Sequence, residues 1–74
     1  MNFKAQTWVK VASQVGGGLG MIVNSLSSTP KKLYWEVMKF DGSKIYHESD
    51  LTEISDEVAQ DFEDYEDILE LMNN

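Results

Sequence analysis

The chain has 74 residues, which predicts a single domain over residues 1–74. It contains no cysteine, so disulfides, thiolate metal sites and cysteine nucleophiles are excluded, and a cytoplasmic protein is expected because small secreted domains usually depend on disulfides. No apolar stretch approaches the roughly 20 residues of a membrane-spanning helix, and the first 26 residues lack the apolar block of a signal peptide.

The first half of the chain predicts two strands joined by a glycine-rich turn. Residues 7–11 alternate between β-branched residues and Trp8 or Lys10, which is typical of a strand. Four of the five glycines lie in residues 14–23, and the segment 19–26 predicts the second strand. A phosphate-binding loop would need a Lys and a hydroxyl after its last glycine, and a dinucleotide fingerprint would need glycine at position 21, where this chain has methionine. The glycines therefore predict a tight turn rather than a phosphate site.

The segment 33–47 carries the strongest strand signal. Apolar and aromatic residues fill both faces of residues 33–40, and Asp41-Gly42 then leads into a second apolar run. An Asp-Gly pair between two such runs predicts a hairpin with a two-residue turn whose two positions both have positive φ. The preceding segment 27–32 contains Pro30 and predicts a polar loop. The segment 48–54 predicts a bend followed by either a short strand or a helical turn.

The C-terminal segment predicts one amphipathic helix over residues 55–72, with Ser55 as its N-cap. Its apolar stripe, widened by Ala59 and Ile68, recurs every three or four residues: Ile54, Val58, Phe62, Tyr65, Leu69 and Met72. Like-charge pairs four residues apart disfavour this helix in isolation. We therefore expect it to pack on the second apolar face of the strand at 33–40, through Val58, Phe62, Tyr65 and Leu69.

The fold predicted from these elements is mainly β (α+β): a small antiparallel barrel or bent sheet of four or five strands over residues 7–54, with one acidic C-terminal helix over 55–72. The order of strands and turns, with "GLGMIV" at 18–23 and "YWEVMKFDGSKIYHESDL" at 34–51, resembles SH3-like barrels of the KOW and Tudor type. The positions that carry the resemblance are Gly18, Gly20, Val37, Phe40, Asp41, Gly42 and Leu51. The resemblance implies a structural barrel and, for KOW modules, binding to RNA or ribosomal proteins.

Charge is distributed unevenly along the chain. Residues 1–50 carry six lysines and four acids, for a net charge of +2, whereas residues 51–74 carry nine acids and no base, for −9. This asymmetry indicates either a solvated face that maintains solubility or a surface for a basic partner. The partner-binding hypothesis assigns the polar face of the predicted helix: Asp56, Glu57, Asp61, Glu63, Asp64, Glu66, Asp67 and Glu70.

A row of carboxylates on a helix could imitate the charge spacing of DNA and occupy the groove of a basic, nucleic-acid-handling protein. In this respect the chain resembles small acidic phage-encoded inhibitors, so the leading hypothesis is a non-enzymatic protein-protein interaction module, with a DNA-mimic inhibitor as its sharpest form. The alternative is a KOW-like nucleic-acid binder that uses Lys31, Lys32, Lys39 and Lys44, although the acidic tail disfavours direct contact with nucleic acid. A homodimer is also possible on the unpaired apolar face.

Other candidate sites have weaker signals. Trp8, Tyr34 and Tyr46 could form an aromatic surface, as the SH3 and Tudor resemblance implies, or could belong to the core. His47, near Ser49 and Asp50, lacks the nucleophile and oxyanion hole of a catalytic triad and is expected at a strand end. The acidic run 61–67 lacks the central glycine of a calcium loop. We therefore predict no catalytic residue, no metal site, no cofactor and no membrane partner.

Overall fold

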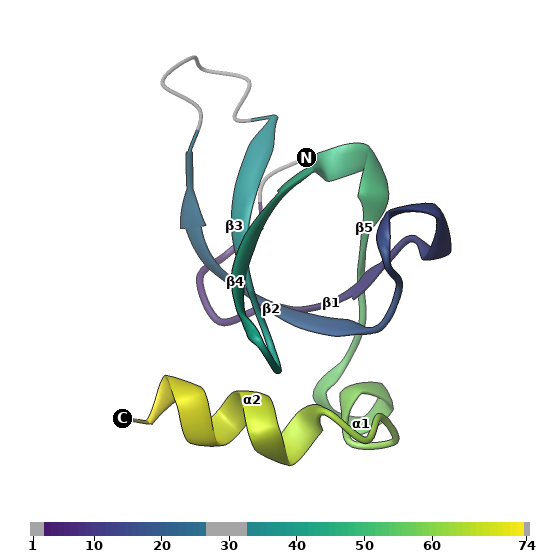
Figure 1. Ribbon diagram of the computed structural model, residues 1–74, viewed down its shortest axis with the longest axis vertical. Coiled ribbons are helices and arrows are strands. Elements are labelled where there is room, and N and C mark those ends of the chain that lie inside the picture. The colour runs from purple at the N-terminus through teal and green to yellow at the C-terminus, as the bar shows by residue number, and fades with distance from the viewer. Residues whose placement is uncertain (1–2, 27–32, 74) are drawn as a thin grey trace.

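The computed structural model describes residues 3–26 and 33–73. Its five strands are β1 (Trp8–Val11), β2 (Leu19–Ser25), β3 (Tyr34–Lys39), β4 (Gly42–His47) and β5 (Leu51–Glu53). All pairings are antiparallel, and the spatial order is β4-β3-β2-β1-β5 (Figure 1). The prediction of a small α+β protein with a five-stranded antiparallel sheet is confirmed. The sheet is bent but not closed, because β4 and β5 are its two edges. Pro30 and the loop predicted around it lie outside the described residues.

The turn between β1 and β2 contains a short 3₁₀ helix, η1 (Ser13–Val15), followed by three glycines with positive φ, Gly16, Gly17 and Gly18. Glycine is favoured there because other L-residues rarely adopt this conformation. Gly20 is required for a different reason, since a Cβ atom at this position would lie 2.3 Å from Cγ1 of Val37 in the neighbouring strand. The prediction of a structural turn is confirmed.

The hairpin between β3 and β4 is also confirmed, but its turn lies one residue earlier than predicted. Lys39 pairs with Gly42, which leaves Phe40 and Asp41 as the turn residues. Only Gly42 has positive φ, at 120°. The expectation of positive φ at both Asp41 and Gly42 was wrong, because a glycine directly after the turn supplies the twist that the strands require. The turn points toward the C-terminal helices (Figure 1).

The segment after β4 contains both elements that the sequence left open. A 3₁₀ turn, η2 (Glu48–Asp50), leads into β5, which pairs with β1. None of the helices in the described ranges 3–26 and 33–73 is long and apolar enough to cross a membrane.

Apolar side chains form two cores on opposite faces of the sheet. The first lies within the curve of the sheet and contains Phe3, Val9, Val11, Ile22, Trp35, Val37, Tyr46 and Leu51. The second lies between the sheet and the C-terminal helices and is built from Trp8, Leu19 and Met21 with Ala59 and Ile68. An extra residue in β2 between Ile22 and Asn24 shifts its register with β3, as a β-bulge does, and such bulges bend a sheet. The three central strands β1, β2 and β3 therefore contribute apolar side chains to both cores.

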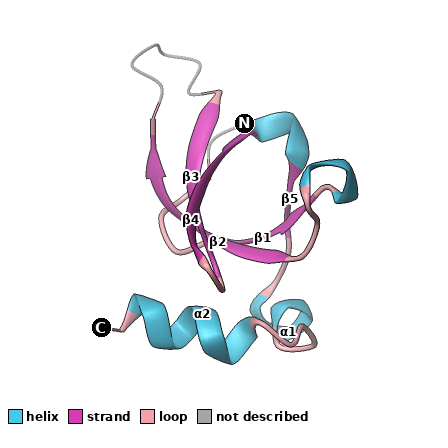
Figure 2. Cartoon of the chain, in the orientation of Figure 1, coloured by secondary structure: helices cyan, strands magenta, loops and turns pink. Residues whose placement is uncertain are grey.

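The C-terminal segment consists of two helices, α1 (Asp56–Ala59) and α2 (Tyr65–Met72), rather than the single helix predicted over 55–72 (Figure 2). The Ser55 hydroxyl accepts a hydrogen bond from the Val58 amide at 3.2 Å, so its role as the N-cap is confirmed. The helix stops where several acids follow one another, and aspartate is a poor helix former. The break lets both short helices pack on the curved sheet.

Packing of the helices on the second face of the sheet is confirmed, with one correction. Phe62, Tyr65 and Leu69 pack against the second core as predicted. Val58 does not, since 47% of it is exposed. Ala59 and Ile68, which lay at the edge of the predicted stripe, are fully buried at its centre. The break changes the orientation of α1 relative to α2. The periodicity of one continuous helix therefore assigned Val58 to the buried side, although it is exposed.

Candidate functional site

The eight acids assigned to a partner-binding face are divided among three segments. α1 carries Asp56 and Glu57, the connection carries Asp61, Glu63 and Asp64, and α2 carries Glu66, Asp67 and Glu70. Two of these acids interact with other parts of the protein, Asp56 through hydrogen bonds and Asp64 through the charge of Lys39, and the other six are exposed without such interactions in the described residues.

Asp56 holds the two helices against β1. Its carboxylate accepts hydrogen bonds from Trp8 Nε1 at 3.0 Å, from Tyr65 Oη at 3.0 Å and from Gln60 Nε2 at 2.6 Å. The rings of the two aromatic donors, Trp8 and Tyr65, stack on each other with their centroids 4.9 Å apart. Hydrogen bonds from Gln60, Tyr65 and Trp8 lower the pKa of Asp56 because they favour the charged carboxylate. Asp56 is exposed, but its carboxylate, unlike those of the other acids of the predicted face, accepts three hydrogen bonds from within the described part of the protein.

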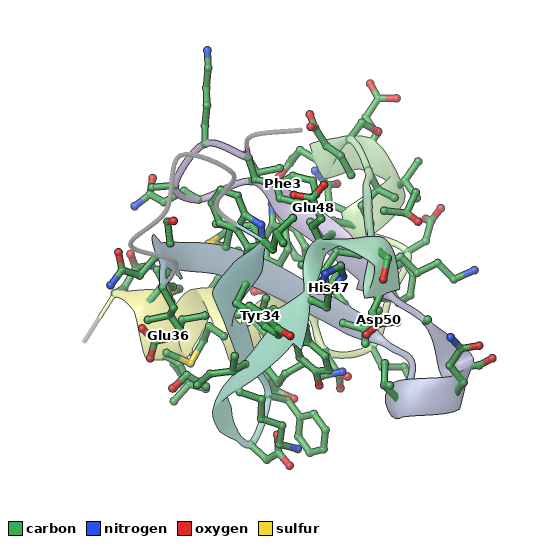
Figure 3. All side chains as sticks on the ribbon, turned by 90° about the horizontal axis from the view of Figure 1, so that it is seen from above. Phe3, Tyr34, Glu36, His47, Glu48 and Asp50 are labelled. Atoms are coloured by element: carbon green, nitrogen blue, oxygen red, sulfur yellow. The ribbon has the colours of Figure 1, made fainter. Side chains whose placement is uncertain are left out.

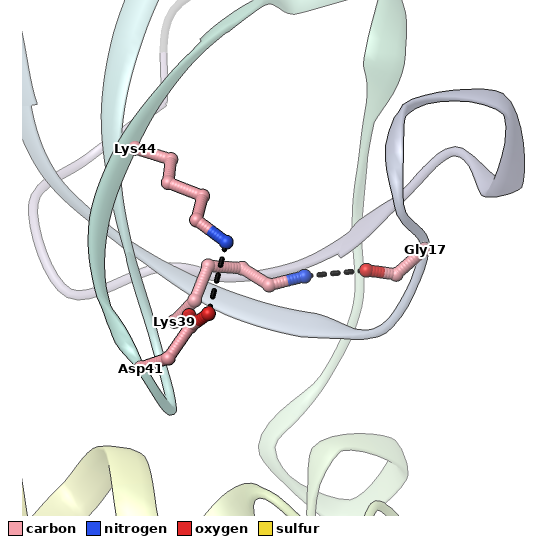
Figure 4. A network of polar contacts seen from close by, with 4 residues as sticks. All are labelled: Gly17, Lys39, Asp41 and Lys44. Carbon is pink, nitrogen blue, oxygen red and sulfur yellow. Dashed lines mark hydrogen bonds and ion pairs between the residues drawn. The ribbon is translucent and has the colours of Figure 1, made fainter.

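Asp64 lies beside a buried cation. The Lys39 side chain is 5% exposed, and its Nζ donates a hydrogen bond to the Gly17 carbonyl (Figure 4). Burial lowers the pKa of Lys39, whereas the nearby charges of Asp41 and Asp64 raise it. Asp64 is half-buried and balances part of this charge. Its Oδ2 atom lies near Gly18, so Asp64 adjoins the glycine turn.

The remaining six acids are exposed: Glu57, Asp61, Glu63, Glu66, Asp67 and Glu70. Within residues 3–26 and 33–73, none of their carboxylates forms an ion pair or a side-chain hydrogen bond. We call these six residues the acidic surface. Uncompensated carboxylates on one side of a small protein create a negative potential that attracts cationic partners.

The predicted aromatic surface does not form. Trp8 is 6% exposed and belongs to the second core, and Tyr46 is 9% exposed and belongs to the first. Of the two alternatives left open by the sequence, both residues belong to the core, because a sheet with a core on each face buries aromatic residues on both of its sides. Tyr34 is 51% exposed, as predicted, and it contacts the His47 ring edge-on with the ring centroids 5.2 Å apart (Figure 3).

His47 lies at the end of β4, where its side chain stabilises the next turn. The Ser49 amide donates a hydrogen bond to His47 Nδ1 at 3.1 Å, and the Ser49 hydroxyl lies 2.8 Å from the same nitrogen. These contacts cap η2. In the part of the chain that the structure describes, no group of three His, Asp or Glu side chains is placed to hold a metal ion.

The glycine turn offers few free amides to an anion. The Gly16 amide donates to the Ser13 carbonyl at 3.2 Å, and the Gly17 amide donates to the Ala12 carbonyl at 3.0 Å. A shallow pocket of about 420 Å³ adjoins the turn and is lined in part by Lys10, Ser13 and Thr52. The turn presents a carbonyl to Lys39 rather than a cradle of amides to a phosphate.

The four lysines proposed for nucleic-acid binding do not form a patch in the described residues. Lys31 and Lys32 lie outside those residues. Lys39 is buried, and Lys44 forms an ion pair of 3.0 Å with Asp41 (Figure 4). The hydrogen bond from Lys44 lowers the pKa of Asp41. These two lysines are therefore engaged with the protein itself.

Sequence reasoning missed a surface pocket between the β3–β4 turn and α2. It has a volume of about 300 Å³ and is lined by Phe40, Asp67, Glu70 and Leu71. Phe40 is 52% exposed and Leu71 is 40% exposed, although both are large apolar residues. The sequence did contain one indication that Phe40 is exposed. It comes directly before Asp-Gly, and a residue at the tip of a hairpin has few neighbours to bury it.

Comparison with protein-family models, with curated proteins and with solved structures finds no match to this chain. Functional assignment therefore depends on the acidic surface and on the pocket at its edge.

Proposed function

We propose that this protein is a non-enzymatic interaction module that binds a basic protein through its acidic surface. The observation that carries the proposal is that six exposed carboxylates on and between two packed helices have no cationic partner within residues 3–26 and 33–73. Asp56 and the second core hold the helices in place, so the charges are presented on a rigid support. A preorganised charged surface speeds association and selects partners of opposite charge.

The sharpest form of the proposal is mimicry of DNA, in which the partner is a protein that handles nucleic acid and the acidic surface occupies its cationic groove. The body that carries the helices is, in the same proposal, an SH3-like module. The order of strands, the glycine turn between β1 and β2, and the tight turn between β3 and β4 support this part of it. In this proposal, the SH3-like body supports the helices, and the carboxylates of the acidic surface bind the partner.

The test compares two variants of equal charge. One neutralises three acids of the acidic surface through Glu57→Gln, Glu63→Gln and Glu66→Gln. The matched control neutralises three acids of the body through Glu36→Gln, Asp50→Asn and Glu53→Gln. Both carry a net charge of −4 instead of −7. Proteins captured from a cell lysate by the immobilised wild type are identified, and their affinities for the wild type and both variants are measured with and without competing duplex DNA.

The proposal predicts that the captured partner is cationic, that duplex DNA competes with the module for it, and that affinity falls steeply with added salt. It also predicts that the surface variant loses at least tenfold in affinity and the control variant less than threefold. The three charges removed from the surface variant all lie in the proposed contact, so their effects on affinity add, whereas those removed from the control lie outside it. Equal affinities of the two variants for the partner would contradict the proposal, since net charge alone would then explain the binding.

A further inference from the structure

The pocket between the β3–β4 turn and α2 has an apolar wall and an acidic wall. Its apolar wall consists of Phe40 and Leu71, and its polar wall consists of the carboxylates of Asp67 and Glu70. Asp67 and Glu70 are three residues apart on α2 and therefore lie on neighbouring turns of one helix face. An aromatic ring beside two carboxylates is complementary to a group that is both flat and cationic.

Within residues 3–26 and 33–73, no cation pairs with the acids of this pocket. The chain contains no arginine. Of the lysines nearest to the β3–β4 turn, Lys39 donates to Gly17 and Lys44 pairs with Asp41, the acid next to Phe40 (Figure 4). The Asp41 charge is thus already balanced, whereas Asp67 and Glu70 have no ion-pair partner in the described parts of the chain.

We propose that this pocket binds an arginine side chain of the basic partner, so that the acidic surface has one specific anchor point at the Phe40–Leu71 wall. The guanidinium stacks on the Phe40 ring and donates hydrogen bonds to Asp67 and Glu70, while the aliphatic stem lies against Leu71. Arginine fits better than lysine because its planar group can stack and can also pair with two carboxylates, whereas an ammonium is a compact and strongly hydrated charge. This inference rests on the proposed function and names the side chain that the partner must supply.

The probe is the capped tripeptide acetyl-Gly-Arg-Gly-amide, titrated into ¹⁵N-labelled protein and followed by NMR. Two further tripeptides replace arginine with lysine or with citrulline, which keeps the shape of arginine without its charge. We expect the arginine peptide to shift the amide signals of Phe40, Asp67, Glu70 and Leu71 selectively. The lysine peptide should bind at least threefold more weakly, and the citrulline peptide should cause no shift at these positions.

Two variants test the apolar wall. Phe40→Ala should weaken binding of the arginine peptide about threefold, the effect expected from loss of a solvent-exposed cation–π contact. Ile45→Ala is the matched control, because Ile45 is 63% exposed on β4 and does not line the pocket, and it should leave the affinity unchanged. The NMR spectrum of each variant reports whether it is folded.

The inference is overturned if arginine and lysine peptides bind equally, with shifts spread over Glu57, Asp61 and Glu63 and no effect of Phe40→Ala. That result would leave the proposed function intact, because the surface would then attract cations by charge alone. Absence of any shift with the arginine peptide also overturns the inference. Failure of the proposed function is a separate result, namely equal affinity of the two charge-matched triple variants for the captured partner.

Discussion

The C-terminal segment has one side that packs on the sheet and one that faces solvent. Both sides contain acidic and aliphatic residues, but these residues are engaged with the protein on the first side and exposed on the second. On the sheet side, Asp56 accepts three hydrogen bonds, and Ile68 is fully buried in the second core. On the solvent side, Glu70 has no partner in the described residues, and Leu71 is 40% exposed. Along α2, a buried residue and an exposed residue are therefore never more than three positions apart, as between Ile68 and Leu71.

The difference indicates which residues specify the fold and which are available for binding. Groups on the sheet side are satisfied by neighbours from β1, α1 and α2, so changing them should affect stability. Groups on the solvent side have few neighbours, so changing them should affect binding and leave stability nearly unchanged. The predictions below test this division.

The largest expected effect comes from the buried side of α2. Ile68→Ala should lower the free energy of unfolding by about 2–5 kcal/mol, because it removes buried methyl groups and leaves a cavity in the second core. Leu71→Ala, three residues away on the same helix, should lower it by at most about 1 kcal/mol, because Leu71 is 40% exposed and lies outside the second core. Urea unfolding followed by circular dichroism measures both. Similar losses for the two variants would show that the division between the sides is not real.

The second prediction concerns the hydrogen-bonded acid. Asp56→Asn should destabilise the protein more than Glu57→Gln, since the carboxylate of Asp56 accepts hydrogen bonds from Trp8, Gln60 and Tyr65. Glu57 is the neighbouring acid in the same helical turn and has no such contacts in the described residues. The two midpoints in urea at pH 7 give the comparison. A larger loss of stability for Glu57→Gln would contradict the prediction, because both variants remove one charge from the first turn of α1 and only Asp56 accepts the three hydrogen bonds.

The third prediction is the pH dependence of this Asp56 contact. The pKa of Asp56 is lowered in the folded state, so its contribution is present above the unfolded pKa of about 3.9 and is lost as pH falls through the folded pKa. The pKa of Tyr65 is raised by its hydrogen bond to Asp56, so that contribution is present below about pH 10 and is lost as pH rises through the folded pKa.

The difference in unfolding free energy between wild type and Asp56→Asn should therefore be constant from about pH 5 to 9 and should narrow on both sides of that range. Asp41 and Lys39 also have shifted pKa values, but they titrate in both proteins and cancel from the difference. A difference that stays the same at pH 3 would mean that the charge of Asp56 contributes nothing to the contact.

Alternation and turn chemistry predicted the first four strands of the sheet and left β5 open between a strand and a helical turn. The residues of each strand carry their own periodic signal, and Gly16 to Gly20 and Gly42 marked the turns. The break between α1 and α2 was not predictable in the same way. Ala59 and Phe62 keep a helical spacing across it, and a sequence pattern does not record the change in direction that packing on a curved sheet imposes.

The candidate site was predicted only in part, because spacing along the sequence does not show which donors surround an acid. Trp8 lies 48 residues from Asp56 along the chain, yet its indole donates a hydrogen bond to that acid. Phe40 and Leu71 line one pocket only because the tertiary fold brings the β3–β4 turn near α2. The uneven distribution of charge along the sequence indicated where the acidic surface lies. The pocket at the edge of that surface could be recognised only from the three-dimensional structure.

The smallest expected effect is a gain in stability on the solvent side. Glu66 and Glu70 repel each other across one turn of α2, and acids near a helix C-terminus oppose the helix dipole. Glu70→Lys should therefore raise the free energy of unfolding by about 0.5 kcal/mol at low salt, with the gain fading at high salt. The same variant should weaken binding of the arginine tripeptide, because it removes one of the two carboxylates in the pocket. Opposite changes in stability and binding would show that the unfavourable charge of Glu70 is kept for recognition, a trade-off typical of functional sites. A loss of stability would instead mean that Glu70 supports α2, and the acidic surface would then have to be explained as part of the fold.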